Sequence, residues 1–274
     1  MPEGDTVHKL ADAIGRTLAG QVTARVTLRG ETVPALAGRR VRAVFAQGKH
    51  LFIRFEEGMT LRSHLGMYGS WHRYASGEPW RKPQAQATLA LWTPPEVLVC
   101  FNAREVELLR SGGIRERNTV RRLGPDLGGE GFCVDEVLRR AREFLEPETL
   151  LVDVLLDQRI AAGIGNVYKS EVLFVEKVHP TLPLEAAGDT VLRRLYTAAH
   201  DLIRANLGGG PRMTRRGNPP LWVYGRHGRP CLRCDESIRY ARLGATMRST
   251  YWCAGCQRSP AEPGADDSSR ARFG

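Results

Sequence analysis

Apolar side chains recur at helical spacing directly after the N-terminus, at Val7, Leu10, Ala11, Ile14 and Leu18. Intervals of three and four residues place such positions on one face of an α-helix. Asp5 precedes them and is a residue type that caps helix N-termini, so we expect it to be the N-cap. The pattern therefore predicts an amphipathic helix at the start of the chain.

Residues 21 to about 103 carry a different pattern, in which short apolar runs alternate with turn residues. Such runs predict strands, and the clearest are Val41–Phe45, Lys49–Phe55, Met59–His64, Ala87–Trp92 and Val97–Phe101. Turn signals such as Gln47-Gly48 and Pro94-Pro95 lie between them. Strands at this spacing predict a β-sandwich or barrel.

The second half of the chain returns to a helical period. Residues 111–131 are rich in glycine and arginine and predict a linker. The helices expected after it are 134–145, 149–160, 165–176 and 189–207. A triple glycine ends the last helix, and the basic loop that continues to residue 220 has no core pattern. Strands followed by helices predict an α+β fold.

Composition and charge narrow the class of protein. The chain has 274 residues, enough for two domains, and 42% of them are hydrophobic and 26% charged. No apolar run approaches the roughly 18 residues of a membrane span, and the acidic start is not a signal peptide. We therefore expect a cytoplasmic protein with no membrane partner. The net charge of +10 fits a nucleic-acid partner, and it also fits a generally basic protein.

Four of the six cysteines form two closely spaced pairs near the C-terminus. Cys231-x2-Cys234 and Cys253-x2-Cys256, with 18 residues between the pairs, fit the four-cysteine zinc pattern. Because four thiolates close the coordination shell, we expect one structural Zn²⁺ and no chemistry at the metal. The segment Tyr240–Trp252 between the pairs predicts a hairpin.

The first residues contain a candidate nucleophile. If the initiator Met1 is removed, the secondary amine of Pro2 becomes the N-terminus, with the acid Glu3 beside it. An α-amino group titrates near ~7.7–8.0, so far more of it is neutral at pH 7 than of a lysine. A secondary amine condensed with an aldehyde-level carbon forms an iminium ion, which is a good electron sink. The alternative is that Pro2 and Glu3 are ordinary residues at a helix entry.

A glycine-containing segment, residues 161–165, joins two of the expected helices. Its glycines allow a sharp turn and the close approach of a ligand, and Asn166 begins the second helix. Backbone N–H groups and an Asn amide at a helix start can bind an anion. A plain helical hairpin is the alternative at this point.

Together these segments resemble one family, the formamidopyrimidine-DNA glycosylase / endonuclease VIII family of base-excision repair enzymes. The resemblance covers about residues 1–258 and rests on four segments: the N-terminal MPEG, the helix–two-turn–helix segment LLDQRIAAGIGNVYKSE, VYGR at 223–226 and STYWCAGCQ in the zinc finger. MPEGDTV, QGKHLFIRF and SHLGMYGSW look more like the endonuclease VIII branch.

The resemblance implies an architecture and a partner. It predicts a catalytic β-sandwich with a leading helix over 1–128, a helix–two-turn–helix DNA-binding domain over 129–225, a zinc finger over 226–258 and a disordered tail over 259–274. Damaged DNA would lie in the cleft between the domains. We further expect a monomer that is associated with the nucleoid.

The resemblance also implies an activity. Pro2 would attack C1′ of a flipped nucleotide and form a Schiff base, and Glu3 would donate a proton. An oxidised base, with pyrimidines favoured, would be removed and the strand cut by β/δ-elimination. Lys49 matches the lysine that assists β-elimination. Arg248 matches the zinc-finger arginine that grips phosphates and is linked to δ-elimination. The alternative for Arg248 is a solvated charge on the hairpin.

Further positions match DNA contacts of the family. Asn166 and Arg122 match phosphate-binding residues. Gly66, Met67 and Tyr68 occupy the position of the wedge that fills the void left by the flipped base, where Met67 or Tyr68 can insert. The alternative for these two side chains is a strand edge packed into the core.

The chain departs from the family pattern at particular positions. Many relatives carry a second acidic residue where Thr6 stands, and Gly66 lacks the polar wedge side chain of some endonuclease VIII members. The loop at 208–220 falls where some relatives cover the extruded base. Two alternatives stay open: the same enzyme directed to oxidised purines such as formamidopyrimidine or 8-oxoguanine, and, in another class, a non-catalytic zinc-finger DNA-binding protein.

Overall fold

The computed structural model describes residues 2–259, and the chain divides into two compact units. The first unit contains the chain up to Cys133 together with Gln158–Ile164 and Ile203–Pro211. The second contains Val134–Asp157, Gly165–Leu202 and the chain from Arg212 onward. Each unit is described by itself below. Met1 and, apart from its first residue, the expected tail at 259–274 lie outside the described residues.

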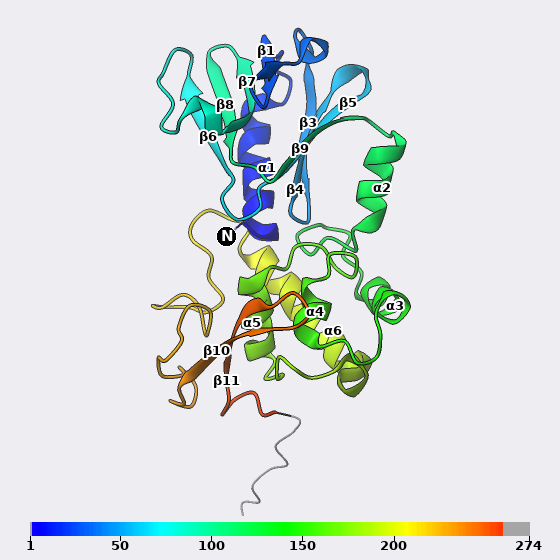
Figure 1. Cartoon of the computed structure of the whole chain (residues 1–274), viewed down its shortest axis with the longest axis vertical. Helices are drawn as coiled ribbons and strands as arrows, with labels where there is room; N and C mark the ends of the chain where they lie inside the picture. Colours follow the sequence, from blue (N-terminus) through cyan, green and yellow to red (C-terminus); the bar gives the residue numbers. More distant parts are fainter. Residues whose placement is uncertain (1, 260–274) are drawn as a thin grey trace, which may run out of the picture. The chain divides into compact units, whose positions relative to one another are not determined.

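The first unit contains two antiparallel sheets, which confirms the predicted sandwich (Figure 1). One has the strand order β2-β1-β7-β8-β6 and the other β3-β4-β5-β9. The strands are β1 (Arg25–Leu28), β2 (Glu31–Thr32), β3 (Val41–Gln47), β4 (His50–Phe55), β5 (Met59–His64), β6 (Ser70–Ala75), β7 (Ala87–Thr93), β8 (Glu96–Phe101) and β9 (Glu105–Arg110). Short 3₁₀ turns lie at Pro34–Leu36, Glu56–Gly58 and Gln84–Gln86. All five expected strands are present, with small differences at their ends.

Two apolar clusters lie on the opposite faces of the five-stranded sheet, because successive side chains along a strand point to alternate faces. Leu89 and Leu91 of β7 belong to the main core, which also buries the apolar face of helix α1 (Gly4–Leu18). Ala90, between them, belongs to a second cluster that includes Tyr74 and Trp80. Successive side chains of a strand point to opposite faces, so the five-stranded sheet is covered by apolar residues on both sides.

Helix α1 begins earlier than the capping pattern predicts. Glu3 occupies the N-cap with an extended backbone, and Asp5 lies buried within the first turn. The N–H of Gly4 donates a hydrogen bond of 2.9 Å to the carbonyl of Gly163. The expectation of an Asp5 cap was wrong because a contact with a distant loop, and not a side-chain cap, accompanies the helix start.

The segment predicted as a linker contains a helix, α2 (Ile114–Arg122). Glu116 is its buried residue, and its carboxylate accepts hydrogen bonds from the Gly112 N–H and from Arg54 of β4. Burial alone would raise the pKa of Glu116, but these hydrogen bonds hold it below its usual value. The linker prediction for 111–131 was wrong because an ion pair with the sheet, and not an apolar stripe, anchors this helix.

The second unit is helical and ends in a hairpin. Its helices are α3 (Val134–Phe144), α4 (Leu151–Leu156), α5 (Asn166–Val175) and α6 (Leu184–Ala205), the last interrupted by a non-helical Gly188 and reaching into residues of the first unit. The predicted hairpin is confirmed as β10 (Ile238–Leu243) and β11 (Arg248–Cys253). Helix α5 packs against β11. Of the helices described here, none combines the length and apolar character needed to cross a bilayer.

Candidate active site and metal centre

The N-terminal residues are held against the loop at 158–164, within the first unit. Pro2 is half-buried and Glu3 is fully buried. A Cβ atom on Gly4 would lie only 3.0 Å from the Cα of Gly163, a distance that side chains rarely tolerate. Glycine at position 4 therefore lets the backbone of the first residues lie directly on this loop.

Lys49 lies at the tip of the β3–β4 hairpin, which approaches the same loop. Gln47 pairs with His50, so Gly48 and Lys49 form the turn, and Gly48 has a φ of +56°. Glycine adopts this left-handed conformation without steric cost. A Cβ on Gly48 would lie 2.6 Å from the Cβ of Ala162. Gly4, two residues after the candidate nucleophile, and Gly48, next to the candidate lysine, thus meet adjacent residues of one loop.

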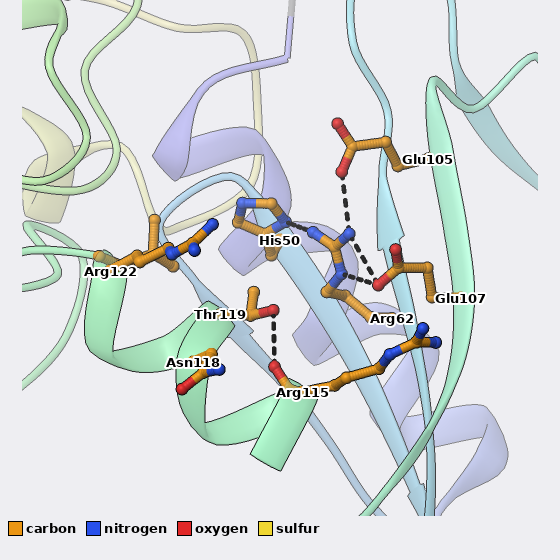
Figure 2. A pocket seen from close by; sticks show the side chains of 9 residues that line it. His50, Arg62, Glu105, Glu107, Arg115, Asn118, Thr119 and Arg122 are labelled. Carbon is orange, nitrogen blue, oxygen red and sulfur yellow. Dashed lines mark hydrogen bonds and ion pairs between the residues drawn. The ribbon is translucent and has the colours of Figure 1, made fainter. Parts of the chain in front are cut away.

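A charged network includes His50, the first residue of β4 after the hairpin tip (Figure 2). The guanidinium of buried Arg62 donates to Nδ1 of His50 at 2.9 Å and to the carboxylate of Glu105 at 2.9 Å. It also forms an ion pair with Glu107 at 3.0 Å. Burial, with the nearby cations, lowers the pKa of His50 to about 3. His50 is therefore neutral, with Nδ1 as the acceptor, directly beside Lys49.

Arg122 lies exposed at the end of α2, where it lines a pocket of about 550 Å³ together with the His50–Arg62 network. Figure 2 shows the other helix residues around this pocket, including Arg115 and Asn118. Sequence reasoning identified Arg122 but missed the helix that carries it. The segment has no apolar periodicity, so nothing in the sequence pattern indicated this helix.

The wedge candidates form an exposed loop between β5 and β6. Met67 is 57% exposed and Tyr68 77% exposed. Gly66 has a φ of +64°, and a Cβ there would meet Arg104 at 2.9 Å. The alternative that Met67 and Tyr68 pack into the core is therefore wrong, and both apolar side chains are accessible to a ligand.

In the second unit, helix α5 carries Asn166 at its first position, as predicted, with Gly165 at the N-cap. Arg248 begins β11 and is exposed. Helix α5 also carries a fully buried lysine, Lys169, whose ammonium group donates to the Ser249 carbonyl at 3.0 Å and to the Thr250 hydroxyl at 2.8 Å. The hydrogen bonds fasten the strand immediately after Arg248 to the helix that begins at Asn166.

A buried carboxylate of the same helix holds the motif at 223–226. Glu171 accepts hydrogen bonds from the backbone N–H groups of Trp222, Val223 and Tyr224 at 2.8–2.9 Å, and from the Thr214 hydroxyl. Several donors to one carboxylate offset the cost of burying its charge. Sequence reasoning missed this role, although an acid in the otherwise apolar stretch that ends α5 was its signal.

The four paired cysteines converge on one point of the second unit. Their Sγ atoms lie within 4.8 Å of one another, with Cys234 and Cys253 at 3.4 Å and Cys231 and Cys256 at 3.8 Å. These distances are far longer than the ~2.05 Å of a disulfide. Four sulfurs at about 2.3 Å from a tetrahedral ion would lie about 3.8 Å apart, so the donor set fits a metal ion.

Known proteins of one family match nearly the whole chain. The family model of the formamidopyrimidine-DNA glycosylase N-terminal domain matches residues 1–108, and that of the formamidopyrimidine-DNA glycosylase H2TH domain matches residues 123–215. The chain is 41% identical to the probable endonuclease 8 2 of Streptomyces coelicolor, over 99% of this chain and 100% of that protein.

Two further similarities support this assignment. The DNA-(apurinic or apyrimidinic site) lyase Nei2 of Mycolicibacterium smegmatis is 36% identical, over 94% of this chain and 99% of that protein. The fold is shared with the Lactococcus lactis formamidopyrimidine DNA glycosylase, at a TM-score of 0.79 and 22% identity, covering 94% of this chain and 100% of that one. The chain therefore belongs to the formamidopyrimidine-DNA glycosylase / endonuclease VIII family, in its endonuclease VIII-like branch.

Proposed function

We propose that this protein is a bifunctional DNA glycosylase and AP lyase of base-excision repair, which removes oxidised bases and then cuts the strand. The names of its endonuclease 8 and AP-lyase relatives support the activity. The observation that carries the proposal is the meeting of Gly4 and Gly48 on one loop, because it puts Pro2, Glu3 and Lys49 in the same region of the first unit.

In the proposed reaction, the neutral amine of Pro2 forms a bond with C1′ of a flipped nucleotide. The C1′–N bond to the base breaks, and Glu3 supplies a proton during base departure and sugar-ring opening. The resulting iminium ion withdraws electrons, so that a proton leaves C2′ and the 3′-phosphate departs with help from Lys49. Arg248 assists the second elimination, which releases the 5′-phosphate. The chemistry requires the base to leave the stack, since C1′ is shielded in a duplex.

The remaining candidates have binding roles in this proposal. Arg248, Asn166 and Arg122 contact phosphates, which fixes the register of the DNA. Met67 or Tyr68, carried by the turn at Gly66, fills the void left by the flipped base. The exposure of the Met67 and Tyr68 side chains supports this role.

The metal has a structural role in this proposal. Cys231, Cys234, Cys253 and Cys256 hold one Zn²⁺, which organises the hairpin that presents Arg248 and takes no part in bond breaking.

We further propose that the domains end at residues 128, 225 and 258. We also propose that the protein is a monomer. Its proposed location is the cytoplasm, at the nucleoid, where the substrate is found. The preferred lesions are oxidised pyrimidines. That preference is what the resemblance to the endonuclease VIII branch implies, and the endonuclease 8 names of the relatives support the branch.

The test is borohydride trapping on a duplex that contains an abasic site. Wild-type protein shown by mass spectrometry to begin at Pro2 should form a covalent adduct. A preparation that retains Met1 should not, because Pro2 then lies in a tertiary amide without a nucleophilic lone pair. Binding without any adduct would favour the non-catalytic zinc-finger protein, and an equal adduct with Met1 retained would contradict the Pro2 mechanism.

Lesion preference is tested with paired duplexes. Single-turnover excision of thymine glycol should exceed that of 8-oxoguanine in the same sequence context. Faster removal of 8-oxoguanine would direct the enzyme to oxidised purines instead, while leaving the lyase mechanism in place.

A further inference from the structure

Gln158 closes the loop on which the N-terminal residues lie. Its side-chain Nε2 donates to the carbonyl of Ile164 at 3.1 Å, and its Oε1 accepts from the N–H of Gly163 at 3.0 Å. The side chain is half-buried. One amide group therefore bonds two consecutive residues of the loop, and it holds the peptide units on either side of the unit that carries the Gly163 carbonyl.

The loop is also anchored on its other side. The N–H of Ala162 donates to the Pro125 carbonyl at 2.9 Å, and the carbonyl of Ala162 accepts from the Leu127 N–H at 3.0 Å. Gly163 itself has a φ of +127°, a conformation that side chains rarely permit. The backbone is thus fastened up to Ala162, and beyond that point the Gln158 amide holds the flexible glycine.

Gly163 is the residue that meets the N-terminus. Its carbonyl accepts the 2.9 Å hydrogen bond from the Gly4 N–H, two residues after Pro2. The preceding residue, Ala162, meets Gly48 of the turn that carries Lys49. A rotation of the Gly163 peptide would therefore displace Pro2 relative to Lys49, because Ala162 stays in place.

We propose that Gln158 is a positioning residue for the reaction, which sets the distance between the Pro2 amine and Lys49 through the Gly163 carbonyl. The inference rests on the proposed function. Gln158 acts without touching the substrate, so its loss changes the rate of bond formation and leaves the phosphate contacts in place.

The main variant is Gln158→Met, which keeps the length of the side chain and removes both hydrogen bonds. Displacements of about 1 Å in a reacting pair cost on the order of a hundredfold in rate, so we expect trapping on abasic DNA to slow by roughly tenfold to a hundredfold. Binding of a duplex with a stable abasic analogue should change much less. Gln84→Ala, a remote and exposed glutamine, is the matched control and should behave as wild type.

A partial variant and a structural readout separate positioning from folding. Gln158→Glu keeps an acceptor for the Gly163 N–H but sets a carboxylate oxygen against the Ile164 carbonyl, so its trapping rate should also fall below that of wild type. Hydrogen exchange at the Gly4 amide should be faster in Gln158→Met, since its acceptor carbonyl is released.

Three results would overturn the inference. The first is Gln158→Met trapping at the wild-type rate. The second is a loss of trapping matched by an equal loss of DNA binding, which would indicate a structural role only. The third is hydrogen exchange at the Gly4 amide that is no faster in Gln158→Met than in wild type. Failure of the wild-type protein to form any adduct would instead contradict the proposed function, and this inference with it.

Discussion

The ammonium group of Lys169 donates a hydrogen bond to the hydroxyl of Thr250 at 2.8 Å, inside the second unit. Lys169 is fully buried on α5, and Thr250 is buried on β11, so this bond joins helix and hairpin. The hydroxyl of Thr250 in turn donates to the carbonyl of Arg248 at 3.0 Å. The position of the Arg248 backbone therefore depends on the packing of the hairpin against α5.

Loss of a zinc ligand should detach Arg248 from this arrangement. We expect Cys253→Ser to reduce the bound zinc and the rate of DNA cleavage together, because the hairpin is too small to fold without metal. The β-sandwich should stay folded, since its cores lie in the first unit. Metal content, cleavage rate and circular dichroism are the measurements. The control is Cys133→Ser, an exposed cysteine outside the cluster. An unchanged cleavage rate in zinc-free protein would contradict this role.

Phosphate binding and acid catalysis should separate between Arg248 and Glu3. Arg248→Ala should weaken binding and reduce the slope of log K against log salt by roughly 0.9, the value of one phosphate contact on duplex DNA. Glu3→Gln should keep the wild-type slope. It should also cut a ready-made abasic site better than it excises a base, since base departure needs the acid most.

Salt titrations and single-turnover rates on both substrates measure these effects. Arg73→Ala, which removes an exposed charge from β6, controls for net charge. Loss of binding in Glu3→Gln, with binding and slope retained in Arg248→Ala, would reverse the assigned roles.

The exposed wedge candidates should affect catalysis more than stability. Tyr68→Ala should change the free energy of unfolding by no more than about 0.5 kcal/mol, as is usual for surface substitutions. Stacking of a base on an aromatic ring contributes about 1–3 kcal/mol, so excision from a duplex should fall roughly tenfold or more. Trapping on single-stranded abasic DNA should be unaffected, because no void has to be filled. Met67→Ala, measured in parallel, identifies which side chain inserts; wild-type excision by both variants would rule out the wedge.

Acid should destabilise the first unit through His50. Burial and the nearby His64, Arg62 and Lys49 lower the pKa of His50 to about 3, below the ordinary value of 6.5. Between these two pH values the unfolded state binds more protons at His50 than the folded state does. The contribution of neutral His50 to the free energy of unfolding is therefore fully present above pH 6.5 and is lost as the pH falls. From about pH 6.5 to about pH 5 the loss should reach at most about 2 kcal/mol.

His50→Gln keeps an acceptor for Arg62 and cannot titrate, so its unfolding free energy should depend less on pH over this window. Denaturant unfolding at several pH values is the measurement, and His227→Gln, at an exposed position, is the control. Parallel pH curves for wild type and His50→Gln would show that His50 is not the group responsible.

Local patterns in the sequence determined much of this protein. The spacing of the four cysteines predicted a cluster that the structure confirms, because two residues between ligands form one tight turn. Short apolar runs bounded by turn residues identified β7 and β8, since a strand whose sheet is covered by apolar residues on both faces needs apolar side chains at nearly every position. The N-terminal and helix–two-turn–helix motifs identified the family before any contact between them was known.

Only the tertiary structure decided which distant residues meet. Helix α2 lies in a segment without apolar periodicity, and the ion pair of the buried Glu116 with Arg54 that anchors it has no signature along the chain. Glu3, and not Asp5, is the N-cap residue of α1, and the N–H of the next residue, Gly4, donates a hydrogen bond to the carbonyl of Gly163. The position of Lys49 depends on Gly48 meeting Ala162. Sequence periodicity reports which face of an element is buried, whereas these contacts arise when packed elements bring backbones together that lie far apart in the chain.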